Sequence, residues 1–107
     1  MNKSSILVVL ITAPRGKSAE ALAKGLVQER LAACVNIVSG VVSHYRWEGK
    51  TCRDRESMLF VKTTAVKLPA LKRWIAAHHP NSVPELIALP IVDGSKAYLS
   101  WLATALR

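Results

Sequence analysis

Hydrophobic residues near the start of the chain form an almost unbroken run over residues 6–12. The run is rich in β-branched side chains, which favour a strand, and its continuous apolar character is typical of a central strand that is covered on both faces. Lys3 ahead of an apolar run is also a feature of secretory signal peptides. However, the run is short and no A-x-A-like cleavage site follows it. We therefore expect a buried strand in a cytoplasmic protein rather than an exported one.

A helical period follows the sequence "APRGK", which interrupts the strand. Ser18 is predicted to cap this helix, and Glu20 in its first turn would oppose the helix dipole favourably. The apolar residues recur every three or four positions, as expected for one helix face packed on a sheet. They are Ala19, Leu22, Ala23, Leu26 and Val27.

Two long segments with period-two alternation, residues 33–47 and 51–63, are predicted to be paired strands. The dipeptide Ser39-Gly40 shifts the phase of the first segment, as a β-bulge does. The sequence "WEGK" between the segments predicts a tight turn in which Gly49 takes a positive φ. Strands in small domains usually have about 5–6 residues. A hairpin this long should extend beyond its own core and need a partner to cover it.

The second half of the chain continues with a helix over residues 66–78, a short strand over 85–91 and a final helix capped by Ser95. The resulting order is β-α-β-β-α-β followed by α. This order predicts an α+β fold, a ferredoxin-like βαββαβ sandwich with an extra C-terminal helix and a long hairpin. A chain of 107 residues is expected to form a single domain.

The chain carries a formal net charge of +8, which would attract polyanions at low salt. The basic residues are scattered, and the densest group, "GKTCRDRES", interleaves Asp54 and Glu56 with Arg53 and Arg55. This pattern favours a generally basic surface over a dedicated nucleic-acid site. No segment reaches the length of about 20 apolar residues that spans a membrane.

Cys34 and Cys52 have no metal or redox spacing, and neither indicates a disulfide framework. We expect Cys34 to be a buried thiol and Cys52 to be exposed and reduced, which favours the cytoplasm. The sequence contains no nucleophile elbow, phosphate loop or G-x-G-x-x-G motif, so we expect a protein that is not an enzyme.

The stretch "HHPNSVPEL" combines the groups that copper(II) prefers, imidazole and carboxylate. Helical spacing places His78 on the face of Leu71 and Ile75, so its ring should point towards the sheet, with His79 at the edge of that face. Glu85 is the nearest oxygen donor. The alternative is structural, because a histidine near a helix C-terminus interacts favourably with the last carbonyls and Pro80 then ends the helix.

Six stretches together resemble the CutA divalent-cation-tolerance family, from about Leu7 to Arg107. They are "ITAP", "ERLAACVNI", "YRWEGK", "VKTT", "HHPNSVPELIALPI" and "YLSWL", in that order. The resemblance implies a small cytoplasmic homotrimer of ferredoxin-like subunits, similar in architecture to PII signalling trimers, that binds copper ions and is associated with tolerance of divalent cations.

The resemblance also implies a copper site. Its matching positions here are His78, Glu85 and Ile11, the last in place of a cysteine. Since Ile11 cannot bind a metal, we expect a two-ligand Cu²⁺ site that is weak. Asn81 is a further departure, because the family commonly has an aromatic residue there.

The same resemblance leaves a second function open, a PII-like ligand-sensing or scaffold trimer without a physiological metal. Such a trimer would hold a small anionic ligand near Arg15, Lys17 and Lys62. Four aromatic residues allow an intersubunit cluster, plain core packing or a ligand-stacking role. They are Tyr45, Trp47, Tyr98 and Trp101. His44 is expected to be an ordinary surface or interface residue.

Overall fold

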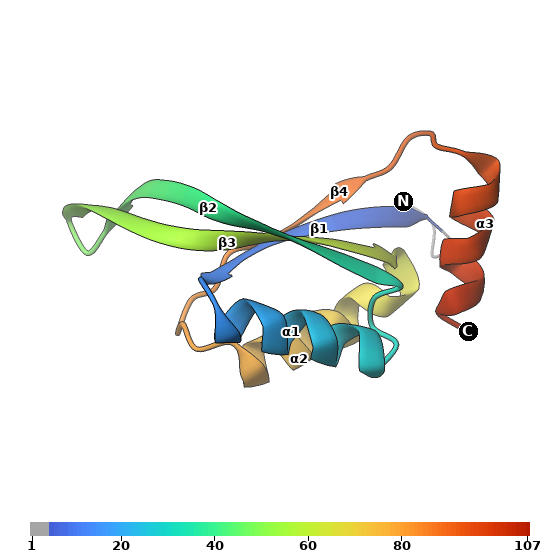
Figure 1. The fold of residues 1–107 in the computed structure, drawn as a ribbon, viewed down its shortest axis with the longest axis horizontal. Coiled ribbons are helices and arrows are strands. Elements are labelled where there is room, and N and C mark those ends of the chain that lie inside the picture. The colour runs from blue at the N-terminus through green and yellow to red at the C-terminus, as the bar shows by residue number, and fades with distance from the viewer. Residues whose placement is uncertain (1–4) are drawn as a thin grey trace.

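Four antiparallel strands form one sheet in the order β2-β3-β1-β4 in the computed structural model, which describes residues 5–107 (Figure 1). The strands are β1 (Ile6–Pro14), β2 (Cys34–Trp47), β3 (Lys50–Thr64) and β4 (Leu86–Pro90). The helices are α1 (Lys17–Gln28), α2 (Leu68–His78), which follows the short 3₁₀ turn η1 (Ala65–Lys67), and α3 (Lys96–Ala105). The predicted α+β ferredoxin-like fold with an extra C-terminal helix is confirmed.

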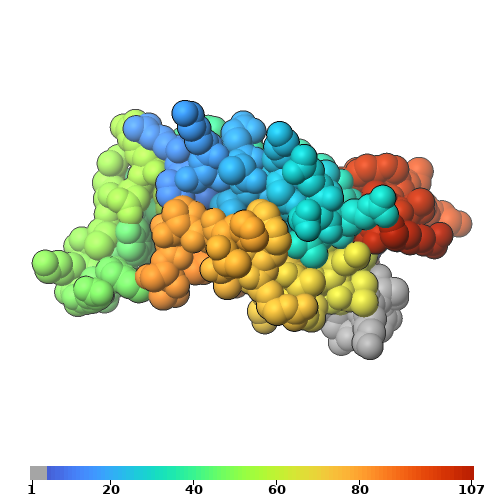
Figure 2. Space-filling view, turned by 90° about the horizontal axis from the view of Figure 1, so that it is seen from below, coloured from blue at the N-terminus to red at the C-terminus, as the bar shows by residue number. Residues whose placement is uncertain are grey.

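The predicted central position of the first strand is also confirmed, since β1 lies between β3 and β4. Its odd-numbered residues point to the side of the sheet that α1 and α2 cover, and Val9 and Ile11 are fully buried there. Figure 2 shows the two helices side by side over this face. Leu26, Leu71 and Ile75 of the helices complete the core.

Two details of α1 differ from the sequence prediction. The helix begins at Lys17 after Gly16 (φ 90°), so Ser18 lies inside the first turn and is not the cap. Val27 is 43% exposed rather than packed on the sheet. The capping prediction for α3 is confirmed, because the Ser95 side chain accepts a hydrogen bond from the Tyr98 amide at 3.3 Å.

The β2-β3 hairpin has strands of 14 and 15 residues and extends well beyond the helices, giving the molecule a long axis of 43 Å (Figure 1). The pairing shifts register between Val38 and Val41, as the predicted bulge at Ser39-Gly40 requires. Glu48 and Gly49 both have positive φ in the turn.

The side of the sheet opposite α1 and α2 is apolar and open, and we call it the outer face. Figure 1 shows none of the described helices over its middle. Leu10 lies between Phe60 and Ile87 on this face, and Val8 lies beside Leu89. Ile87 is 51% exposed and Leu89 is 44% exposed. This face presents large apolar side chains to solvent in a single chain.

The burial predictions for both cysteines are wrong. Cys34 was predicted to be buried and Cys52 to be exposed, but each is half-buried. Both are free thiols. Cys34 lies at the start of β2, where the edge of the sheet leaves it partly open, and Cys52 is shielded by the opposite hairpin strand, on which Tyr45 is its partner. No helix within residues 5–107 is long and apolar enough to cross a membrane.

Candidate functional site

Neither of the two adjacent histidines has the orientation predicted from helical spacing, which placed His78 inward and His79 at the edge of the inward face. His79 is only 8% exposed, whereas the side chain of His78 is exposed. The helix ends at His78, and His79 has extended backbone angles (φ −75°, ψ 137°). Because the rotation of about 100° per residue stops at the helix end, it no longer predicts the direction of the second ring. The inward ring therefore belongs to His79.

The imidazole of His79 is fully engaged by backbone groups. Its Nδ1 accepts a hydrogen bond from the Asn81 amide at 3.0 Å, so its Nε2 carries the proton and donates to the Thr12 carbonyl at 2.8 Å. Both nitrogens are thus used in holding the segment after α2 against the end of β1. This ring has no lone pair left for a metal ion.

The ring of His78 lies on the outside of the helix layer and stacks on Trp74, with ring centroids 4.0 Å apart. Its Nδ1 donates to the Trp74 carbonyl at 2.8 Å, one helical turn back, which leaves the Nε2 lone pair available. The ring borders a small cavity of about 250 Å³ between α1 and α2, together with Ser18 and Pro80.

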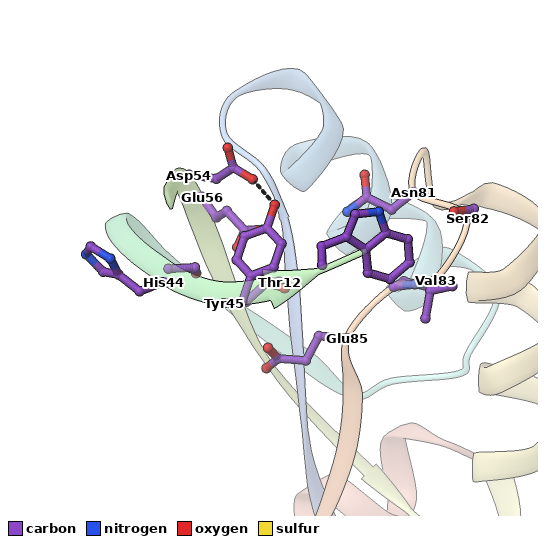
Figure 3. Close-up of a pocket in the computed structure, with 12 residues that line it drawn as sticks. Thr12, His44, Tyr45, Asp54, Glu56, Asn81, Ser82, Val83 and Glu85 are labelled. Carbon is purple, nitrogen blue, oxygen red and sulfur yellow. Dashed lines mark hydrogen bonds between the residues drawn. The ribbon is translucent and has the colours of Figure 1, made fainter. Parts of the chain in front are cut away.

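Glu85 lies elsewhere, in a larger cavity of about 640 Å³ on the outer side of the sheet (Figure 3). One wall is the distal hairpin, with Tyr45, Asp54 and Glu56, and the other is the segment from Asn81 to Glu85. In Figure 3 the carboxylate of Glu85 points from this segment towards the hairpin strand that carries Tyr45. His44 is at the rim, with its ring turned away.

The residues that the resemblance associates with copper do not form one site in a single chain. His78 and Glu85 line different cavities, and the side chain of Ile11 is buried in the core without any donor atom. Among residues 5–107 there is no group of three or more His, Cys, Asp or Glu side chains arranged to hold a metal ion. A single chain therefore does not fit a complete copper centre.

A hydrogen bond across the hairpin organises the acidic wall of the cavity. The Tyr45 hydroxyl donates to the Asp54 carboxylate (Figure 3). This bond, followed by desolvation and the negative charges of Asp54 and Glu56, raises the pKa of Tyr45 to about 12. The carboxylates favour the neutral phenol because its ionisation would add another negative charge beside them.

The three basic residues suggested for an anionic ligand are not neighbours in one chain. Arg15 and Lys17 follow the end of β1, whereas Lys62 pairs with Val8 near its beginning and donates to the Asn36 side chain. The distance along the strand from Val8 to Pro14 is about 20 Å, at about 3.3 Å per residue. The structure therefore separates this proposed set.

The sequence prediction did not identify Asp54, Glu56 and Trp47 as cavity residues. A signal was present, because strand alternation places Tyr45, Trp47, Asp54 and Glu56 on one face of the hairpin. The missing information was that the segment before β4 would lie opposite this face, which depends on the tertiary structure.

Comparisons with known proteins agree with the resemblance. A family model described as "CutA1 divalent ion tolerance protein" matches residues 7–105. The divalent-cation tolerance protein CutA of Thermus thermophilus is 55% identical over 95 residues, covering 89% of this chain and 92% of that protein.

Solved structures with the same fold cover nearly the whole chain. The crystal structure of CutA1 from Oryza sativa has a TM-score of 0.94 and 44% identity, covering 98% of this chain and 96% of that one. A protein from Archaeoglobus fulgidus, described as a periplasmic divalent cation tolerance protein CutA, has a TM-score of 0.92 and 35% identity, covering 95% and 99%.

Proposed function

Because this chain belongs to the CutA1 divalent ion tolerance protein family, we propose that it acts in the tolerance of divalent cations. In this proposal it is a non-enzymatic homotrimer of the cytoplasm that binds copper(II) weakly. The observation that carries the cation role is the family match over nearly the whole chain.

The outer face supports the homotrimer. Phe60 on β3 and Ile87 and Leu89 on β4 are between 36% and 51% exposed in one chain. Leu10 of β1 lies between Phe60 and Ile87, so the apolar surface crosses three strands. Contiguous apolar surface of this kind is usually covered by a partner. The projecting hairpin gives each subunit a second element that a neighbouring copy can cover.

His78 and Glu85 are the proposed copper ligands. The free Nε2 of His78 and the exposed carboxylate of Glu85 are both suitable donors for Cu²⁺. These two residues line different cavities of one chain. The coordination sphere of a Cu²⁺ ion bound at either residue must therefore be completed by water or by groups of a neighbouring subunit. This requirement, together with the absence of a thiolate at Ile11, makes the proposed binding weak.

Copper(II) titration followed by calorimetry tests these ligands. We expect His78→Ala and Glu85→Ala each to weaken binding relative to the unmodified protein. His44→Ala is the matched control, since it removes an exposed histidine outside the proposed ligand set. Equal binding by all four proteins would remove both residues from any copper site.

Cytoplasmic localisation is part of the proposal and needs a separate measurement, because the relative from Archaeoglobus fulgidus is described as periplasmic. Fractionation of cells that produce the untagged chain is expected to recover it with cytoplasmic markers. Recovery with periplasmic markers would contradict this part of the proposal and leave the cation role unaffected.

The cavity of about 640 Å³ favours a second candidate, a PII-like trimer that binds a small molecule without a physiological metal. Its volume lies in the usual range for ligand pockets, and it combines an indole and a phenol ring with several carboxylates. Thermal-shift screening in EDTA tests this function. A ligand that stabilises the unmodified protein should lose its effect on Trp47→Ala.

A further inference from the structure

A thiol, an amine and an amide meet at the base of the β2-β3 hairpin. Cys34 begins β2, and Lys62 is its direct partner on β3. The Cys34 thiol donates to the side-chain oxygen of Asn36 at 3.7 Å, and the Lys62 ammonium donates to the same oxygen. Because both groups contact one oxygen atom, the sulfur of Cys34 and the side-chain nitrogen of Lys62 are neighbours in space.

A further group borders the thiol, the hydroxyl of Tyr98 on α3. Desolvation, followed by the neighbouring Cys34 thiol, raises the pKa of Tyr98. Figure 1 shows β2 beginning at the end of the sheet that carries α3, far from the hairpin turn. We call these four residues the thiol–amine cluster. They are Cys34, Asn36, Lys62 and Tyr98.

The surroundings of Cys34 are those of a reactive thiol. Reactive cysteines are partly exposed and lie beside cationic groups, whereas structural cysteines are buried and inert. Cys34 is a half-buried free thiol, and Lys62 is half-buried beside it. No carboxylate within residues 5–107 forms an ion pair with Lys62, so among these residues only the Asn36 side chain holds its amine.

We propose that Cys34 and Lys62 form a reversible sulfur–nitrogen crosslink when the protein meets hydrogen peroxide. First, the Cys34 sulfur takes one oxygen atom from the peroxide and becomes a sulfenic acid, while the peroxide is reduced to water. The Lys62 ammonium then loses one proton to solvent, and its nitrogen attacks the sulfur. The S–N bond forms as the S–O bond breaks, and the leaving hydroxide takes a second proton from the nitrogen to become water.

The two strands place the reacting atoms within reach of each other. Directly opposed residues of an antiparallel pair have Cβ atoms about 4.5–5.5 Å apart. The four-carbon stem of a lysine is flexible, so the Lys62 nitrogen can move from the Asn36 oxygen to the sulfur without a change in the backbone. The second thiol of the chain does not compete within one subunit, because Cys52 lies opposite Tyr45 in the distal part of the hairpin.

The crosslink requires no free surface on the assembled protein. Both residues belong to one chain, and the only reagent that must reach them is peroxide, a molecule little larger than water. Cover of the outer face and of the projecting hairpin by a neighbouring copy is therefore compatible with it. Neither residue is a proposed copper ligand, so a result against the crosslink leaves the copper proposal standing.

The crosslink changes both charge and stability. It removes the positive charge of Lys62 and ties the start of β2 to β3, closing a covalent loop through the whole hairpin. Closing a loop stabilises a folded chain mainly by restricting the unfolded one. The thermal unfolding temperature should therefore rise on oxidation and return to its starting value when a reductant is added.

Peptide mass spectrometry after treatment with hydrogen peroxide tests the crosslink on the full chain carrying Cys52→Ser, which leaves one thiol. We expect a peptide pair joined through Cys34 and Lys62, with two hydrogen atoms fewer than the reduced peptides together. Tryptic cleavage after Lys62 should be lost, and dithiothreitol should restore it. EDTA is included because traces of copper would oxidise the thiol by another route.

Lys62→Arg keeps the positive charge but has no nucleophilic amine. In this variant we expect oxidation to stop at the sulfenic acid of Cys34, which dimedone traps, with no crosslink and no rise in the unfolding temperature. Lys67→Arg is the matched control, since Lys67 is also half-buried but lies on η1, beyond the end of β3. It should form the crosslink as readily as the parent chain.

Several outcomes would overturn the proposal. They are a crosslink to a lysine other than Lys62, oxidation of Cys34 to a sulfinic acid without any crosslink, and a disulfide between two copies of Cys34 on a non-reducing gel. Equal oxidation products in Lys62→Arg and the parent chain would overturn it as well. Circular dichroism spectra matching the parent chain would show that the variants are folded.

Discussion

His79 joins two backbone segments that lie far apart in sequence, the end of β1 and the turn after α2. Its ring donates to the Thr12 carbonyl and accepts from the Asn81 amide, and it is almost completely buried while doing so. Thr12 and Asn81 both line the larger cavity. His79, which helical spacing placed at the edge of the inward helix face, therefore holds two of the residues that line the candidate site.

We expect His79→Ala to lower the free energy of unfolding by about 1–3 kcal/mol, because it leaves a buried carbonyl without its donor. His78→Ala is the matched control and should cost less, since that ring is exposed and its loss leaves no buried group unpaired. Urea unfolding at one fixed protein concentration measures both. Equal losses would contradict the structural role assigned to His79.

Tyr45 gives a pH-dependent prediction. Its pKa is raised from 10.0 to about 12, chiefly by the hydrogen bond to Asp54. A group whose folded-state pKa is raised stabilises the protein fully below its unfolded pKa. We therefore expect this contribution to be present below pH 10 and lost as the pH rises towards 12.

The absorbance of the phenolate measures this titration directly. The chain has only two tyrosines, so a Tyr98→Phe background isolates Tyr45. In that background, Asp54→Asn should move the Tyr45 titration down towards pH 10, because the main cause of the raised pKa is removed. Asp93→Asn, which removes an exposed carboxylate outside the hairpin, should leave it unchanged. An unaltered titration in Asp54→Asn would show that the bond does not persist in solution.

At the scale of elements, local sequence patterns predicted most of the fold because the deciding interactions are local. The period of two, the phase shift at Ser39-Gly40 and the turn at Gly49 each depend on neighbouring residues, and all three are present. The start of α1 was mispredicted for a related reason. Ser18 is a good capping residue, but Gly16 permits the positive φ at which the chain turns into the helix two residues earlier.

Packing between α1 and α2 depends on a contact that no local pattern reveals. A Cβ atom at Gly25 would lie 2.4 Å from the Trp74 ring, which itself stacks on His78. Only a residue without a side chain lets α1 approach the indole this closely. Trp74 is partly buried and packs against the core, but its partner across the helix pair could not be inferred from the sequence.

Gly25→Ala is therefore expected to lower the free energy of unfolding by about 1–3 kcal/mol, although alanine has the higher helix propensity. The cost should shrink or change sign in a Trp74→Leu background, where the clash is removed. Denaturant unfolding of the double-mutant cycle measures this coupling. An identical effect of Gly25→Ala in both backgrounds would contradict the close contact.

At the scale of the whole molecule, the candidate sites depend on which elements meet, and the sequence alone did not show this. The residues of "HHPNSVPEL" were predicted to act together because they are close in the chain. The end of α2 instead directs His78 to the helix side and Glu85 to the outer side of the sheet. The acidic wall of Asp54 and Glu56 comes from a hairpin about 30 residues earlier, whose position opposite Glu85 follows from strand order.

The contacts within a single chain explain only part of the continuous apolar character of β1. It predicted cover on both faces, yet only the face with Val9 and Ile11 is fully buried. The other face, with Leu10 between Phe60 and Ile87, remains open in one chain. A strand that is apolar on both faces but covered on one is consistent with burial of the second face by assembly.

Ile87→Glu tests this assembly. A carboxylate in the middle of the outer face cannot be buried against another apolar surface without a large desolvation cost. Light scattering should therefore give a mass near the 11.7 kDa of one chain, where the unmodified protein is expected to give three times that mass. Val27→Glu is the matched control, because it places the same charge at a comparably exposed apolar position (43%) on the opposite, helix side. If Val27→Glu dissociated the protein and Ile87→Glu did not, the helix layer rather than the outer face would be the surface that joins the subunits.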